Sequence, residues 1–133
     1  MSVSVVVSGG ILTVLTTDKN NYSLGDPVRI TLSMQNISFR PVTLTYPTTQ
    51  RYDFIVNGVD GIAWQWSAEK YFAQVVEQKT LWPGQGLSYT ETWGQKNNQG
   101  RPVSSGYYRI TGWNTFNGFT GHPLPSTFIL ISD

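Results

Sequence analysis

Few side chains in this sequence could do catalytic chemistry, and they do not cluster. His122 is the only histidine among 133 residues, and it stands between Gly121 and Pro123 with no nucleophile motif nearby. A catalytic triad would need a serine and an aspartate beside it, and a histidine metal site would need a second ligand. The chain has no cysteine, which excludes thiolate nucleophiles, thiolate metal ligands and disulfides. We therefore expect no enzymatic activity, no cofactor and no metal.

The eight carboxylates are also dispersed along the chain. Residues 18–22, Asp-Lys-Asn-Asn-Tyr, offer oxygen atoms at a calcium-like spacing but lack the glycine and the closing glutamate of a calcium loop. We expect a solvated turn there. Glu91 has the same parity as the apolar residues around it. It either reaches water from a strand edge or a bulge, or lies buried and paired with Arg109 or Arg51.

Two segments have side chains suited to binding another protein. Residues 95–102 should form an exposed hairpin tip that carries Lys96 and Arg101, either of which a serine proteinase could accept as a substrate-like side chain. The alternative is that this hairpin only connects two strands. Residues 114–125 form a long loop rich in Gly, Pro and Phe. Its Phe116 and Phe119 would make a binding hot spot, unless the loop folds back over the end of the domain.

The charge balance excludes other classes of partner. Nine basic and eight acidic residues give a net charge of +1, and no basic stripe indicates a nucleic-acid binder. No apolar run approaches the ~18 residues of a membrane span. Charged residues make up 13% of the chain, about half the usual ~25%. A surface of neutral polar groups is poorly protected against self-association.

The elements that must position these residues are strands, because apolar residues recur with a period of two. Val28, Ile30, Leu32 and Met34 alternate with polar residues, as in a strand with one buried face. The same alternation recurs, with turn residues between the runs, at 11–17, 42–46, 52–56, 87–93, 108–110 and 127–132. This pattern predicts an all-β, immunoglobulin-like antiparallel β-sandwich of seven to nine strands. We expect one helical turn from Ser67 and buried side chains at Trp64, Trp93 and Tyr108.

The first ten residues stand apart from the sandwich domain, which we assign to residues 11–133. Residues 1–10 would supply an extra strand, with Val3, Val5 and Val7 on one face, and a flexible hinge at Gly9 and Gly10. Such a tethered strand could add to the sheet edge of a neighbouring copy and so build open filaments. Alternatively, it pairs within its own domain, and the two glycines form a bulge that switches the strand between sheets.

The middle of the chain resembles the BsuPI family of intracellular proteinase inhibitors. The resemblance runs from about Gln50 to Gly112 and depends on the order and spacing of short motifs: Arg51-Tyr52-Asp53-Phe54, Trp64-Gln65-Trp66-Ser67, Phe72-Ala73-Gln74, Leu81-Trp82-Pro83-Gly84, Thr92-Trp93 and Gly106-Tyr107-Tyr108. It implies an immunoglobulin-like sandwich and inhibition of a serine proteinase. The motif residues are scaffold types, and Tyr108 has the position of a tyrosine corner, whose hydroxyl bonds to the backbone.

These observations favour a non-catalytic domain that binds another protein. One hypothesis is an inhibitor of a serine proteinase, and the alternative is a structural or cell-surface subunit that assembles with copies of itself by strand addition. No signal peptide is visible before Val7, so the chain is either cytoplasmic or a mature exported chain. The low charge favours an extracellular or cell-surface location. There, the glycosylation sequons at Asn21 and Asn36 would matter.

Overall fold

The computed structural model describes residues 1–117 and 124–133, and strands dominate that part of the chain. In chain order they are β1 (Ser2–Ser8), β2 (Ile11–Thr17), β3 (Asn21–Ser23), β4 (Val28–Asn36), β5 (Val42–Tyr46), β6 (Tyr52–Gly58), β7 (Gly61–Gln65), β8 (Glu77–Leu81), β9 (Gly86–Trp93), β10 (Gly106–Asn114) and β11 (Ser126–Ser132). A short 3-10 helix, η1 (Trp66–Glu69), includes the helical turn expected at Ser67.

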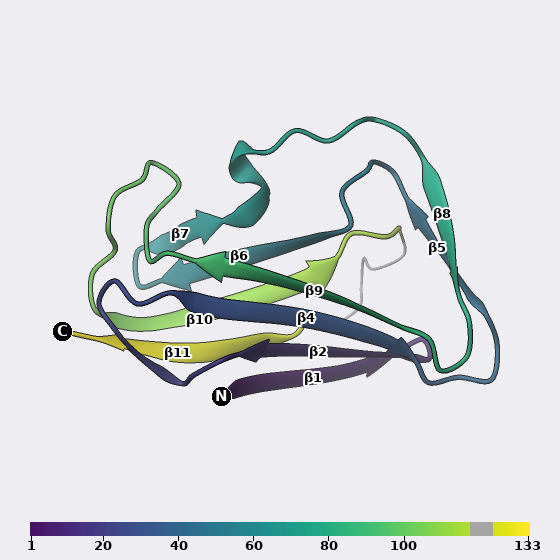
Figure 1. Ribbon diagram of the computed structural model, residues 1–133, viewed down its shortest axis with the longest axis horizontal. Coiled ribbons are helices and arrows are strands. Elements are labelled where there is room, and N and C mark those ends of the chain that lie inside the picture. Colours follow the sequence, from purple (N-terminus) through teal and green to yellow (C-terminus); the bar gives the residue numbers. More distant parts are fainter. Residues whose placement is uncertain (118–123) are drawn as a thin grey trace.

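Two sheets form a sandwich, which confirms the predicted fold class (Figure 1). One sheet has the order β1-β2-β4-β9 and the other the order β3-β11-β10-β6-β7. Neighbouring strands are antiparallel, except that the short β3 runs parallel to β11. These sheets hold nine strands, and a separate sheet of β5 and β8 raises the number of described strands to eleven.

The core lies between the two sheets and follows the predicted alternation. Inward residues of β4, including Val28, Ile30 and Leu32, are fully buried. Trp93 and Tyr108 are buried as expected, and the Tyr108 hydroxyl donates to the carbonyl of Ser104 at 2.6 Å, which confirms the tyrosine corner. Trp64 was predicted to be buried but is only half-buried. It lies on β7, an edge strand, so its ring stacks on Trp93 and packs against the core but stays partly exposed.

The sheet of β5 and β8 covers one end of the sandwich (Figure 1). Its apolar residues Leu44, Tyr46 and Leu81 form a second core cluster with Ile11 and Met34 from the main sheet. This packing fixes both strands against the sandwich. It therefore also fixes the ends of the two connections that leave them, residues 47–51 after β5 and residues 70–76 before β8.

The N-terminal segment is an ordinary hairpin strand in this structure. β1 pairs with β2 along its whole length, from Ser2 opposite Thr17 to Ser8 opposite Ile11. Gly9 and Gly10 have φ of 59° and 79°, the left-handed pair that a two-residue hairpin turn requires. The structure therefore has a tight turn where the sequence suggested a flexible hinge or a sheet-switching bulge.

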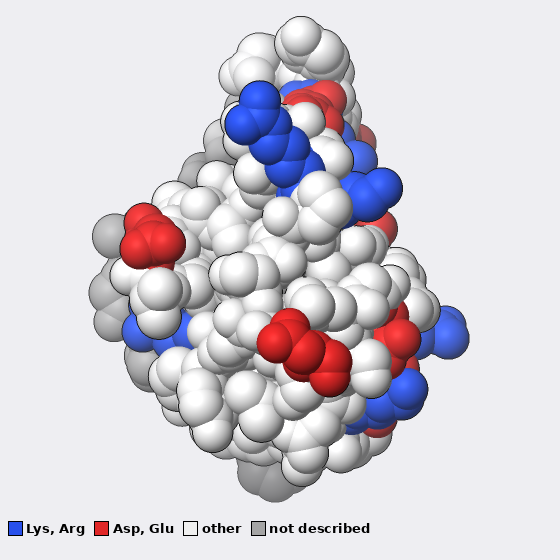
Figure 2. Space-filling model, turned by 90° about the vertical axis from the view of Figure 1, so that its left-hand side faces the viewer, with Lys and Arg blue, Asp and Glu red and all other residues white. Residues whose placement is uncertain are grey.

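Charged side chains are spread in small groups of both signs over the face drawn in Figure 2, between wide uncharged areas. This distribution agrees with the low charge content of the sequence. Within residues 1–117 and 124–133, no helix has the length and hydropathy needed to span a membrane.

Candidate functional site

The most prominent exposed segment of the described chain is the connection from η1 to β8, residues 70–76. It contains no helix, strand, turn or bend, and Figure 1 shows it passing over the connection between β5 and β6 without reversing direction. Tyr71 is 100% exposed, and Val75 and Val76 are also exposed. Within the described residues, the main-chain N–H groups of Phe72, Gln74 and Val75 donate no hydrogen bond. The segment thus has an extended backbone free to pair with another chain.

One scaffold residue holds the middle of this segment from below. The main-chain N–H of Thr49 donates to the carbonyl of Ala73 at 3.0 Å, and the N–H of Ala73 donates to the Thr49 hydroxyl oxygen at 3.0 Å. Thr49 lies 24 residues earlier in the chain, in the connection between β5 and β6. Both polar groups of Ala73 are therefore directed into the protein, whereas Gln74 and Val75, which follow it, are exposed.

Phe72 anchors the segment through a column of aromatic rings. Its ring lies 6.0 Å from that of Trp66 between ring centres, Trp66 stacks on Tyr52 at 4.6 Å, and Tyr52 stacks on Tyr89 at 4.5 Å. The Lys70 ammonium lies 4.8 Å from the centre of the Trp66 ring, where a cation is attracted by the electron-rich face. Phe72 and Lys70 are thus tied to the same scaffold ring, on either side of the exposed Tyr71.

Glu91 contacts this column at Tyr52, the ring that stacks between Trp66 and Tyr89. It lies half-buried on β9 and accepts a hydrogen bond from the Tyr52 hydroxyl at 2.8 Å. Burial raises the pKa of the Tyr52 hydroxyl well above its usual value of 10, and the adjacent carboxylate raises it further. The partner of Glu91 is therefore a tyrosine of the opposite sheet, and neither Arg109 nor Arg51 pairs with it.

A buried carboxylate organises the corner from which the segment starts. Asp53 of β6 accepts hydrogen bonds from the Phe54 N–H at 2.8 Å, the Gln65 side-chain amide at 2.8 Å, the Ser67 N–H at 3.1 Å and the Ser67 hydroxyl at 2.5 Å. These bonds fix the end of β7 and the first turn of η1. They explain physically why an aspartate stands in the motif Arg51-Tyr52-Asp53-Phe54 and a serine after Trp66.

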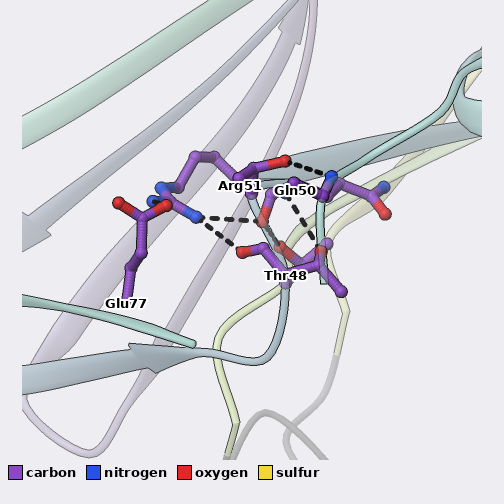
Figure 3. Close-up of polar contacts among 7 residues, drawn as sticks. Thr48, Gln50, Arg51 and Glu77 are labelled. Carbon is purple, nitrogen blue, oxygen red and sulfur yellow. Dashed lines mark hydrogen bonds and ion pairs between the residues drawn. The ribbon is translucent and has the colours of Figure 1, made fainter. Parts of the chain in front are cut away.

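An ion pair fastens the other end of the segment (Figure 3). The Arg51 guanidinium lies 2.7 Å from the Glu77 carboxylate, donates to the carbonyl of Thr48 at 2.9 Å and packs 4.2 Å from the centre of the Tyr46 ring. Glu77 is the first residue of β8. Residues 47–51 therefore brace the exposed segment at Ala73 and at its C-terminal end.

The hairpin that carries Lys96 and Arg101 has a different character. Both side chains are exposed, but the backbone around them is used internally. The Asn97 N–H donates to the carbonyl of Arg101, and the Asn97 side chain accepts from the N–H groups of Gln99 and Arg101. Gln95 has φ of 57° and a buried side chain that bonds to the chain at Ser23, Gly25 and Asp26. The hairpin is a compact turn and cannot enter a proteinase cleft as an extended strand without unfolding.

The other predicted contact residues do not join this site. Phe116 is half-buried against the second core cluster, as expected if the loop folds back over the domain. Phe119 lies outside the described residues, as does His122. Val3, Val5 and Val7 are exposed by 50–58% on the outer face of β1. Figure 1 places β1 at the opposite margin of the molecule from residues 70–76.

A family model decides the relationship of this chain to known proteins. The model for BsuPI, described as intracellular proteinase inhibitor, matches residues 15–118. The chain belongs to the BsuPI family. The match confirms the resemblance seen in the motifs and includes the exposed segment, its brace and the hairpin. No curated protein sequence matches the chain.

Solved structures add support for the fold of this BsuPI protein. A β-glucosidase from Erythrobacter marinus is 14% identical with a TM-score of 0.52, over 89% of this chain and 15% of that one. A β-glucosidase from Listeria innocua is 12% identical with a TM-score of 0.51, over 91% and 16%. An alkylpurine DNA glycosylase from Pseudomonas fluorescens is 13% identical with a TM-score of 0.53, over 90% and 29%. The chain spans less than a third of each, and the likeness concerns the fold alone.

The family also corrects one expectation from the sequence. The low charge favoured an extracellular or cell-surface location, but the BsuPI family is described as intracellular, which points to the cytoplasm. Low charge reflects the threonine- and serine-rich strand faces, so it carries no information on compartment. Asn36, one of the two sequon asparagines, is fully buried, and its amide donates to the carbonyls of Arg40 and Leu81.

Sequence reasoning missed the exposed segment itself. In the sequence, Phe72-Ala73-Gln74 is one of the scaffold motifs, and Tyr71, Val75 and Val76 have the composition of a strand. One signal was available. Five apolar or aromatic residues in seven show neither a period of two nor a period of 3.6, and such a run has no regular way to bury its side chains.

Proposed function

We propose that this BsuPI protein is a non-catalytic inhibitor of a serine proteinase, and that residues 70–76 are the segment that enters the proteinase cleft. Proteinases hold their substrates extended, with main-chain hydrogen bonds along the strand and a pocket for one side chain. Residues 70–76 offer such a strand, with the fully exposed Tyr71 in the place of the pocket-filling side chain.

Rigidity would turn this substrate-like segment into an inhibitor. Ordering a flexible loop on binding costs affinity, and a loop already held in its bound shape avoids that cost. Lys70 and Phe72, on either side of Tyr71, are both tied to Trp66. If the proteinase attacks the bond after Tyr71, the two new ends stay in place, so the bond can re-form and the cleaved product does not leave.

The observation that carries the proposal is the pair of hydrogen bonds between Thr49 and Ala73. They fix an exposed, extended backbone from one side only and leave its other side open. The internally bonded hairpin of Lys96 and Arg101 has no such open side. We therefore assign the inhibitory contact to residues 70–76 in preference to the hairpin.

Titration against pure proteinases tests this function. Subtilisin-like and trypsin-like enzymes are assayed on a small chromogenic peptide with increasing amounts of the intact protein and of a Lys96→Ala/Arg101→Ala double variant. We expect competitive inhibition by both proteins, because the hairpin is not the inhibitory segment. Absence of inhibition at micromolar concentrations, or simple digestion, would refute an inhibitory function. Loss of inhibition in the double variant alone would move the site to the hairpin.

A further inference from the structure

The two main sheets have four edge strands, and three of them are protected against pairing with another chain. β3 is only three residues long. The edge of β7 is covered by Asn98, whose side-chain oxygen accepts from the Gln65 N–H at 2.9 Å and whose amide donates to the Gln65 carbonyl at 3.0 Å. β9 has the carboxylate of Glu91 directed inward, toward Tyr52. Short strands, covering groups and inward charges are the usual ways to block an edge.

β1 is the fourth edge strand and has none of these protections. Its seven residues pair with β2 in one continuous register, without a charged residue, a proline or a bulge. In the part of the chain that the structure describes, no strand pairs with its outer side. A long, regular, uncharged edge of this kind is a template for a further strand.

The hairpin turn decides which backbone groups face outward. In a two-residue hairpin the residues that flank the turn, Ser8 and Ile11, form a hydrogen-bonded pair, and bonded pairs alternate along the ladder. Ser8, Val6, Ser4 and Ser2 therefore bond to β2. The outward N–H and C=O groups belong to Val3, Val5 and Val7, whose side chains all lie on the outer face of the sheet.

We propose that β1 pairs with β1 of a second copy of this chain, antiparallel about a two-fold axis at Val5. The outward groups are self-complementary, because Val5 then faces Val5 and Val3 faces Val7, which gives about six main-chain hydrogen bonds. The valine side chains of the two copies meet on one face. They continue the apolar strip formed by Leu12 and Val14 of β2, which lie opposite Val7 and Val5.

The features of β1 favour a second copy over an unrelated partner. Neither copy brings a charged side chain to β1, so a two-fold contact places no like charges together. A two-fold contact uses β1 of both copies, so the assembly closes as a dimer and does not extend into the open filament that the sequence suggested. A single strand edge is smaller than the ~800 Å² per partner of a standard interface, so the dimer should depend on concentration.

Sedimentation equilibrium and amide hydrogen exchange test this dimer on the intact chain. We expect the mass to rise with concentration from 14.9 kDa toward twice that value. The amides of Val3, Val5 and Val7 should gain protection over the same concentration range. Val5→Lys places a charge on the two-fold axis at an exposed side chain and should weaken the dimer at least ~10-fold.

The matched control is Ser88→Lys, which adds the same charge to the same sheet, on the exposed face of β9. It should leave the dissociation constant of the dimer unchanged. A wild-type chain that stays monomeric at the highest attainable concentration overturns the proposal. So does a dimer in which the three valine amides gain no protection, since such a dimer uses another surface. The exchange result holds even if Val5→Lys fails to fold.

Discussion

Tyr71 and Phe72 are neighbours in the chain but lie in opposite environments. The Tyr71 side chain is 100% exposed, whereas the Phe72 ring packs against Trp66 with 6.0 Å between ring centres. The half-buried Phe72 can hold Tyr71 in its exposed position only if the backbone between them is fixed. The Thr49–Ala73 hydrogen bonds and the Asp53–Ser67 bonds supply that support from either side.

Thr49→Val tests whether the brace matters for inhibition more than for stability. Valine keeps the branched shape but removes the hydroxyl that accepts the Ala73 N–H. An exposed hydrogen bond of this kind contributes about 0.5–1.5 kcal/mol, so the protein should still fold. We expect the inhibition constant to rise about 10-fold, because the segment loses its fixed shape. Enzyme inhibition and urea unfolding measure the two effects separately.

The control for this change is Thr92→Val, at an exposed position on β9. It should alter neither the inhibition constant nor the free energy of unfolding. If Thr49→Val inhibits as tightly as the wild type, the brace plays no part in inhibition.

Asp53→Asn should destabilise the whole corner at η1. The carboxylate accepts four hydrogen bonds, and an asparagine would direct its own N–H groups at some of those donors. Leaving buried donors without acceptors should cost about 2–4 kcal/mol of unfolding free energy. Asp60→Asn, in the exposed turn between β6 and β7, is the matched control and should change it by less than about 0.5 kcal/mol. Equal unfolding free energies for the two variants would contradict the role assigned to Asp53.

The unfolding free energy should fall at alkaline pH. Burial raises the pKa of Tyr22 to about 12, helped by its hydrogen bond to Asp18, and burial raises the pKa of Tyr46 to about 12 as well. Both pKa values exceed the unfolded value of 10, so the folded state retains these protons. The stability that these two groups contribute is therefore fully present below pH 10 and is lost as the pH rises from 10 to about 12.

Urea unfolding across this range measures the effect, and Tyr22→Phe isolates one contribution. The variant should show a shallower fall because it has one buried hydroxyl fewer to ionise. An identical pH dependence in the two proteins would show that Tyr22 does not contribute.

The fold was predictable because it depends on local pattern. Alternation in residues 28–34 predicted β4 and its buried face, and Tyr108 after a glycine predicted the tyrosine corner, with its bond to Ser104. Trp64 shows the limit of this reasoning. A period of two gives the face of a strand but not whether the strand lies at a sheet edge, where an inward ring stays partly open.

The candidate site was not predictable because long-range contacts define it. Thr49 meets Ala73 only after β5 pairs with β8, and Arg51 meets Glu77 for the same reason. The sequence predicted Lys96 and Arg101 as contact residues because a serine proteinase can accept a basic side chain on an exposed hairpin. The hydrogen bonds that make this hairpin compact come from amide side chains, Asn97 above all, whose partners a sequence does not reveal.

The inhibition constant of Tyr71→Ala tests the central claim most directly. Tyr71 is expected to fill the primary pocket of the proteinase, and its exposure means that truncation should leave the fold intact. Loss of a hot-spot aromatic costs about 2 kcal/mol or more, so the constant should rise at least ~30-fold relative to the wild type. Tyr107→Ala, at another exposed tyrosine on β10, should leave it unchanged. A Tyr71→Ala protein that inhibits as tightly as the wild type would contradict the assignment of residues 70–76 as the inhibitory segment.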